Sequence, residues 1–191
     1  MTSSQRTPGR PFDAHIEAEL LRATQDLLIK KGFERLTVDA VAKRCSASKA
    51  TIYRRWPSKV ALAVAATAAL FSVPEVPNTG DLREDLLACG RAYIYEDGRI
   101  AVLTNLLTAA RHDPALLTAA RDAIGSPVNE LFEHVLTRAF SQGVIAKSID
   151  IVSEVFPAIA FHYVAALGFP IDEHLVLRVI DGVLLPALRV T

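Results

Sequence analysis

The chain has 191 residues, 51% of them hydrophobic, with 21 Lys and Arg against 21 Asp and Glu. Its longest nearly unbroken apolar run, residues 60–71, is well short of the ~20 residues that a transmembrane helix needs, so we expect no membrane partner. Residues 1–10 lack the apolar stretch of a secretory signal, and the two cysteines lack the close spacing of a metal or redox motif, which favours a cytoplasmic protein.

The charge is unevenly distributed along the chain. Residues 1–60 hold 12 Lys and Arg against 6 Asp and Glu, a formal charge of +6, and residues 61–191 hold 9 against 15, a charge of −6. A basic amino-terminal part indicates a polyanionic partner such as DNA, although the net charge of the whole chain is zero.

The first 60 residues predict three helices. Apolar positions repeat at helical spacing after Asp13, a candidate N-cap, and this first helix ends at a basic turn and a glycine near residue 32. Thr37 is placed to cap a short second helix. After a tight turn at residues 45–47, Ser48 is placed to cap a third helix, which Pro57 ends.

The rest of the chain is also predicted to be helical. A fourth helix, capped by Ser58, leads to a segment rich in Pro and Gly at residues 72–80. Further helical segments follow, with the third of them either bent at Gly125 or divided into two helices there: 81–95, 99–112, 114–142, 150–168 and 172–189. Pro157 cannot donate to the carbonyl of Ser153 and is expected to kink its helix.

These elements predict an all-α fold of about nine helices in three parts. Residues 1–60 would form a three-helix DNA-binding module, with residues 1–12 as a disordered basic arm. Residues 61–80 would form a connecting helix and a linker, and residues 81–191 a larger helical bundle.

The stretch from residue 36 to residue 62 has the layout of a helix-turn-helix: two capped short helices joined by a three-residue turn. The second helix must enter a DNA major groove, so it needs small or hydrogen-bonding side chains on one face and buried ones on the other. Lys49, Thr51 and Arg54 meet the first need, and Ile52 and Trp56 meet the second.

This stretch resembles the TetR family of bacterial regulators, whose motif reads T-x-x-x-[IV]-A-x-x-x-x-[VA]-S-K-[GA]-T-[IL]-Y-x-x-[FW]-P-S-K. The matching residues here are Thr37, Val41, Ala42, Ala47, Ser48, Lys49, Ala50, Thr51, Ile52, Tyr53, Trp56, Pro57, Ser58 and Lys59. Two positions depart from the family: Ser46 stands where glycine is usual in the turn, and Ala50 stands where glycine is common. A serine there predicts a turn without the positive φ that glycine permits.

The resemblance implies which residues contact DNA. Thr37, Tyr53 and Lys59 would bind phosphates, while Lys49, Ala50, Thr51 and Arg54 would face bases. Ser48 would contact DNA in addition to capping its helix. Arg6 and Arg10 in the arm would follow the minor groove.

For the body, the resemblance implies a homodimer formed by the last two long helices and a cavity for a small apolar or amphipathic effector. The candidate interface residues are Val155, Ile159, Tyr163, Ala166, Val176, Ile180, Val183, Leu184 and Ala187. The candidate cavity residues are Tyr93, Leu103, Asn105, Leu106, Phe132, Phe156, Phe161 and His162. The resemblance favours a repressor that binds a palindromic operator and responds to this effector.

Two other functions compete with this one. An architectural protein that bends or bridges DNA without an effector would share the basic module. An enzyme that uses the module for targeting would need a catalytic cluster in residues 81–191, where we find no His-x-x-x-His spacing, phosphate loop or nucleophile elbow. We therefore expect no catalytic residue, metal or cofactor.

Overall fold

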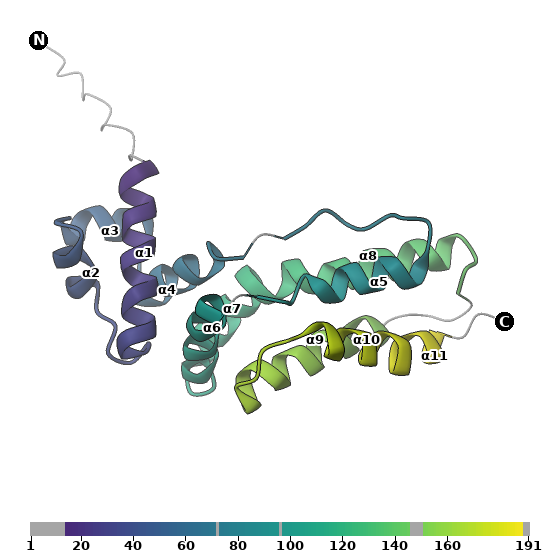
Figure 1. The fold of residues 1–191 in the computed structure, drawn as a ribbon. Helices are drawn as coiled ribbons and strands as arrows, with labels where there is room; N and C mark the ends of the chain where they lie inside the picture. The colour runs from purple at the N-terminus through teal and green to yellow at the C-terminus, as the bar shows by residue number, and fades with distance from the viewer. Residues whose placement is uncertain (1–13, 72, 96, 146–150, 189–191) are drawn as a thin grey trace, which may run out of the picture.

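The computed structural model describes residues 14–71, 73–95, 97–145 and 151–188. Within these ranges the regular secondary structure is entirely helical, which confirms the all-α prediction. Some consecutive segments run on without a break, so the described chain forms nine continuous helical rods, as predicted. Figure 1 shows a small group of helices at the amino-terminal end and longer rods packed side by side beyond it.

The amino-terminal group contains four helices: α1 (Ala14–Lys31), α2 (Val38–Arg44), α3 (Lys49–Arg55) and α4 (Lys59–Ala68). Three predicted N-caps are confirmed, because each hydroxyl accepts a hydrogen bond from the backbone N–H three residues later. These caps are Thr37 (3.2 Å), Ser48 (3.0 Å) and Ser58 (3.0 Å). Asp13, the cap predicted for α1, lies outside the described residues.

A shared apolar core holds these helices together. Leu20 and Leu28 of α1, Val41 of α2, Ile52 of α3 and Leu62 of α4 are all fully buried. Burial of one leucine or isoleucine side chain contributes about 1.5–3 kcal/mol, so this core fixes the short helices α2 and α3, which are too short to be stable alone.

The body contains the other five rods of the described chain. They are formed by α5 (Leu82–Arg91); α6 (Asp97–Ala110); α7 (Pro114–Ala120), η1 (Arg121–Gly125) and α8 (Ser126–Ser141); α9 (Val152–Phe161) and η2 (His162–Leu167); and α10 (Glu173–Val179), η3 (Ile180–Leu184) and α11 (Leu185–Leu188), with η denoting π-helical turns. Helix α4 joins the two parts, because it packs on α1 and also contacts α6, α7 and η1. Figure 1 shows α4 at this junction.

The segment predicted at residues 114–142 is one rod with a π-helical turn in its middle. Asp113 caps α7 through bonds to two backbone N–H groups, with Pro114 at the first helical position. No side chain caps the start of α8, because the chain is already helical through η1. Residues 114–141 are therefore one continuous helical rod whose π-helical turn includes Gly125, so the alternative of two separate helices is wrong.

Helix α5 is fastened to the carboxy-terminal rod along its length. A Cβ built on Gly90 would lie 2.7 Å from Cγ1 of Val176, so the two backbones approach more closely than any side chain on α5 would allow at this position. Two ion pairs flank this contact: Arg83 binds Asp181 through two bonds of 2.7 and 2.8 Å, and Arg91 binds Glu173 at 2.7 Å.

A buried carboxylate fixes the linker to the bundle. Asp85 of α5 accepts hydrogen bonds of 2.7 Å from both the backbone N–H and the hydroxyl of Thr79, and one of 2.8 Å from Arg138 of α8. The same Arg138 nitrogen also donates to the carbonyl of Pro77. Because a buried charge is costly unless paired, this network holds the Pro-rich segment in one path along α5 and α8.

Candidate DNA-binding surface and effector cavity

The turn between α2 and α3 keeps the shape that glycine normally provides. Ser46 has φ of +50°, and the backbone N–H of Ala47 donates to the carbonyl of Ala42 at 2.9 Å to close the turn. Our prediction that serine would remove the positive φ was therefore wrong. The cost of placing an L-residue in the left-handed region, about 1–2 kcal/mol, is offset by the packing of the helices on either side.

Helix α3 buries one face and presents the other. Ile52 and the following Trp56 are 0% and 6% exposed, as expected from their four-residue spacing. Lys49, Ala50 and Arg54 are exposed, and so is Tyr53, at 47%. The protomer therefore leaves this face of α3 uncovered over its whole length, which is the condition for entering a major groove.

The amino-terminal end of α3 is ordered by hydrogen bonds between its own side chains. The hydroxyls of Ser48 and Thr51 lie 2.8 Å apart, and Ser48 also accepts from the Thr51 backbone N–H. Lys49 pairs with Asp39 of α2 at 2.7 Å, and this bond raises the pKa of the lysine. Both partners are largely solvent-exposed, so the pair is weak and can exchange for a phosphate or a base.

Two residues expected to bind phosphates differ in their surroundings. Thr37 is exposed at the N-terminus of α2. Lys59, in contrast, donates to the carbonyl of Phe33 at 3.2 Å and lies 4.2 Å from the centre of the Phe33 ring. Its ammonium group thus holds α4 against the end of α1, and its assignment as a phosphate contact stays a prediction. Arg6 and Arg10 lie outside the described residues.

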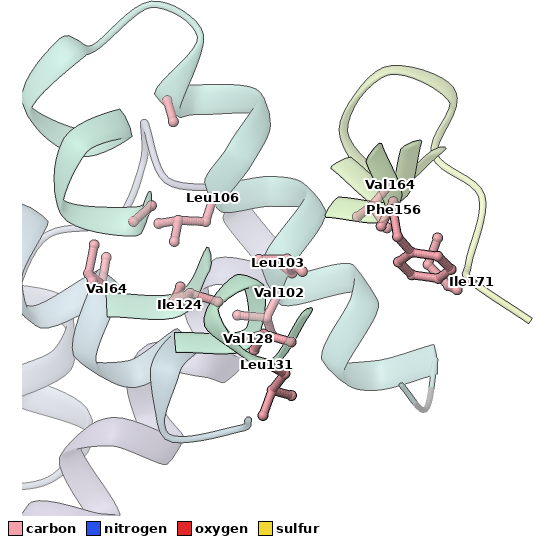
Figure 2. Close-up of a cluster of buried hydrophobic side chains, with 14 of the residues drawn as sticks. Val64, Val102, Leu103, Leu106, Ile124, Val128, Leu131, Phe156, Val164 and Ile171 are labelled. Carbon is pink, nitrogen blue, oxygen red and sulfur yellow. The ribbon is translucent and has the colours of Figure 1, made fainter. Parts of the chain in front are cut away.

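The body contains a cavity of about 860 Å³ between α6, the α7–η1–α8 rod and the α9–η2 rod. Its lining is Tyr93, Tyr95, Leu103, Leu107, Leu117, Ala120, Arg121, Ile124, Gly125, Ser126, Val128, Asn129, Glu130, Glu133, Ser153, Glu154, Pro157, Ala158, Ala160, Phe161, Val164 and Ile171. Figure 2 shows Leu103, Ile124 and Val128 on one side and Val164 and Ile171 on the other.

Three of the eight predicted cavity residues, Tyr93, Leu103 and Phe161, line this space. The other five do not, and they are Asn105, Leu106, Phe132, Phe156 and His162. Leu106 and the two phenylalanines are fully buried in the core, where Phe132 and Phe156 stack at 5.2 Å between ring centres. These residues support the cavity wall from behind.

The two polar candidates are also placed elsewhere. The amide of Asn105 donates to the carbonyl of Ala101 one turn earlier on α6, at 3.0 Å. His162 is exposed on the outer side of η2, next to Tyr163. Residue type alone favoured both as polar anchors, but their positions on the helix faces direct them away from the cavity.

The cavity lining contains a hydrogen-bonded pair of polar side chains, Tyr93 and Asn129. The Tyr93 hydroxyl donates to Oδ1 of Asn129 at 2.7 Å, and both residues belong to the lining. Burial raises the pKa of Tyr95 to about 12 and raises that of Tyr93 further, so both phenols remain neutral at physiological pH. Sequence reasoning missed Asn129, which follows a core position on α8 and carries no signal until the rod is packed.

Three elements of the cavity wall, α6, α7 and η1, also contact α4. The π-helical turn η1 contributes Arg121, Ile124 and Gly125 to the lining, and it also contacts α4. Figure 2 shows Val64 of α4 on the side of Ile124 that faces away from α9. A ligand that moved η1 would therefore act directly on the helix that follows the DNA-binding motif.

The predicted interface residues fall into two groups. Val176, Ile180 and Leu184 are fully buried within the protomer, so they cannot meet a partner, and their inclusion is corrected. The others are half-buried or exposed: Val155, Ile159, Tyr163, Ala166, Val183 and Ala187. Ile159, Tyr163 and Val183 line a shallow hollow of about 460 Å³ together with His162 and Arg178.

Two other kinds of site are missing from the described ranges. Within them, no group of three His, Cys, Asp or Glu side chains is arranged to hold a metal ion. No helix in the same ranges is both long and apolar enough to cross a bilayer.

The exposed α3, its capped N-terminus and its buried opposite face define a helix-turn-helix protein of the DNA-binding transcription-regulator class. Comparison with known proteins agrees: residues 20–66 match the family described as "Bacterial regulatory proteins, tetR family", and residues 76–183 match "Tetracyclin repressor-like, C-terminal domain". The second match covers more than half of the chain. The protein belongs to the TetR family, as its motif predicted.

Curated relatives extend this similarity over nearly the whole chain. The "uncharacterized HTH-type transcriptional regulator Rv1556" of Mycobacterium tuberculosis is 36% identical over 176 residues, which are 90% of this chain and 87% of the relative. The "DNA-binding transcriptional repressor TetR" of Mycobacteroides abscessus is 34% identical over 179 residues, which are 90% of this chain and 93% of that protein.

Solved structures share the fold. The TetR family transcription regulator SCO0332 has a TM-score of 0.61 and 31% identity, with 88% of this chain and 98% of the other covered. The flavonoid-responsive regulator FrrA has a TM-score of 0.66, with 91% and 97% covered, but at 21% identity it is similar in fold alone. DNA-binding transcription regulation is the function of the family to which this chain belongs.

Proposed function

We propose that this protein is a homodimeric repressor that binds a palindromic operator through α3 and is released from it by a small molecule in the 860 Å³ cavity. One observation carries the proposal: the segment η1 forms part of the cavity wall and also contacts α4, which begins directly after the helix-turn-helix. This contact would couple ligand binding in the cavity to release of DNA within one protomer.

The residues proposed to read DNA lie on α3 and at the N-termini of α2 and α3. Lys49, Ala50, Thr51 and Arg54 would face base edges, while Thr37, Ser48 and Tyr53 would position the helix on phosphates. Lys59, whose ammonium also donates to the carbonyl of Phe33, would add a further phosphate contact. Two copies of α3 related by two-fold symmetry would read half-sites about 34–36 Å apart, one turn of DNA.

Release would follow from a change in the separation of the two α3 helices. A ligand shifts this equilibrium only by its difference in affinity for the two spacings, so it must contact an element whose position differs between them. Displacement of η1 by a ligand would tilt α4 and carry α3 with it. Repression, as opposed to activation, is supported by the name of the 34% identical relative, a transcriptional repressor.

The DNA-reading assignment is tested by three substitutions measured by fluorescence anisotropy, on an operator selected from random DNA at fixed salt. We expect Arg54→Ala to weaken operator binding by about 1–3 kcal/mol and Tyr53→Phe to weaken it by less. Arg55→Ala is the matched control, because Arg55 lies on the same helix and pairs with Glu17 of α1 at 3.4 Å. Equal losses for Arg54 and Arg55 would contradict the assignment.

The proposed dimer face is tested by sedimentation. Val183→Glu places a charge among Ile159 and Tyr163, and we expect it to convert the dimer to a monomer. Phe140→Glu is the control, since Phe140 is 50% exposed on α8 and is not among the candidate interface residues. Dissociation by both variants, or by neither, would contradict the placement of the interface.

The effector role is tested by a compound screen scored on release from the operator. Leu117→Trp, at a 43% exposed position of the lining, should keep operator affinity and lose the response to active compounds. An architectural protein would instead gain thermal stability from DNA and from no small molecule. Absence of any releasing compound in the screen would favour that second function.

A further inference from the structure

The cavity combines an apolar interior with a charged margin. Its deeper wall is formed by buried aliphatic side chains such as Leu103, Ile124 and Val164. Aromatic rings of Tyr93, Tyr95 and Phe161 complete it. A ligand that fits this wall must be largely hydrophobic, and aromatic faces also attract cations through their ring quadrupoles.

Three carboxylates also belong to the lining. Glu130 and Glu133 lie three residues apart on α8, hence on one face of that helix, and Glu154 lies on α9. In the described part of the chain none of the three makes an ion pair, whereas Glu84, Glu173 and other glutamates do. Their charges are therefore available to a ligand.

The single basic residue of the lining does not balance them. Arg121 is paired with its neighbour Asp122, with 3.2 Å between Nε and Oδ1. The lining therefore carries three carboxylates against one guanidinium that already has an acidic partner. An anion entering the cavity would be repelled by the glutamates of both α8 and α9, and a neutral molecule would gain nothing from their negative potential.

We propose that the cavity selects an amphipathic organic cation, with its apolar groups against the aliphatic and aromatic wall and its positive charge near Glu130, Glu133 and Glu154. This inference rests on the proposed effector role of the cavity and adds the ligand's chemical class. All three glutamates are exposed, so each contributes modestly, and the discrimination between cations and anions comes from their shared negative charge.

The test uses two ions of matched shape and opposite charge, tetraphenylphosphonium and tetraphenylborate, titrated calorimetrically into the full-length protein. We expect the cation to bind and the anion to bind at least about tenfold more weakly. Glu130→Gln, Glu133→Gln and Glu154→Gln should each lower the cation affinity by about two- to fivefold, and the triple variant by about tenfold or more. Glu75→Gln, an exposed site outside the cavity, should leave it unchanged.

Higher salt should weaken cation binding to the wild type more than to the triple variant, because salt screens the charges of the three glutamates and the triple variant lacks them. Equal affinity for the two ions, preference for the borate, or no binding of either ion overturns the inference. The effector proposal is judged separately, by the release screen, which scores compounds of any charge. Unchanged thermal unfolding of the triple variant will show that the substitutions act on binding.

Discussion

Gly90 provides the sharpest test of how the bundle is packed. It lies on α5 at the point where this helix meets α10, and its backbone φ is not positive, so alanine is compatible with its conformation. The added Cβ would lie 2.7 Å from Val176 Cγ1 and 3.3 Å from two atoms of the Phe156 ring. Val176 and Phe156 are 0% and 1% exposed, so neither side chain has free space to move into.

The magnitude follows from two opposed effects. Alanine gains about 0.5–1 kcal/mol over glycine within a helix. Overpacking a filled core costs about 1–3 kcal/mol, and Val176 cannot turn aside easily because a β-branched side chain has one strongly preferred rotamer in a helix. We expect Gly90→Ala to destabilise the protein by about 1–2 kcal/mol, which corresponds to roughly 2–8 °C in the unfolding midpoint.

The assay is thermal unfolding at one fixed protein concentration, since a dimer's midpoint depends on concentration. Val176→Ala removes the clashing methyl group and should cost about 2 kcal/mol alone. The double variant should lose less than the two single losses together, by about 1 kcal/mol. Gly98→Ala, where an added Cβ would meet no atom within 4 Å, should be neutral or stabilising. A stabilising Gly90→Ala, or strict additivity with Val176→Ala, would refute the packing argument.

Three further predictions concern other parts of the chain. Ser46→Gly should stabilise the protein by about 0.5–1 kcal/mol in thermal unfolding, because glycine adopts the observed φ of +50° without strain, whereas Ser46→Ala should give no such gain. Asp85→Asn should destabilise the protein by about 2–3 kcal/mol, because it leaves the guanidinium of Arg138, which is 25% exposed, without its carboxylate partner. A smaller loss of stability than that caused by breaking an exposed pair, such as the pair of Arg83 and Asp181, would refute this. Burial raises the pKa of the Cys89 thiol from 9.0 to about 12. The neutral thiol's contribution to stability is therefore complete below pH 9 and is lost as the pH rises toward 12. The thermal unfolding midpoint of the wild type should fall more steeply than that of Cys89→Ala between about pH 8 and 10.5.

Much of the helix-turn-helix could be predicted because its determinants are local. The caps at Thr37, Ser48 and Ser58 and the buried face of α3 depend on residues within three or four positions of one another. The turn at Ser46 was mispredicted for a related reason: residue type indicates conformational preference, but packing of α2 and α3 can impose a disfavoured φ.

The cavity could be predicted only in part. Residue type and helical spacing indicate which positions are apolar and buried, and three of the residues chosen in this way, Tyr93, Leu103 and Phe161, line the cavity. It cannot separate a residue that lines a cavity from one that fills the core behind it, as Phe132 and Phe156 do. The same ambiguity put Val176 in the predicted dimer interface.

By itself, the sequence determined the helical class, the family, the helix proposed to read DNA and the division into a basic module and an acidic body, because these depend on short-range spacing and on the order of charges. Only the tertiary structure decided which apolar faces meet within the protomer, that Lys59 is bound to Phe33, and that η1 connects the cavity to α4. Those features require segments far apart in the chain to be packed together. The free energy of that packing depends on how well the side chains fit one another in space, which the order of residue types does not specify.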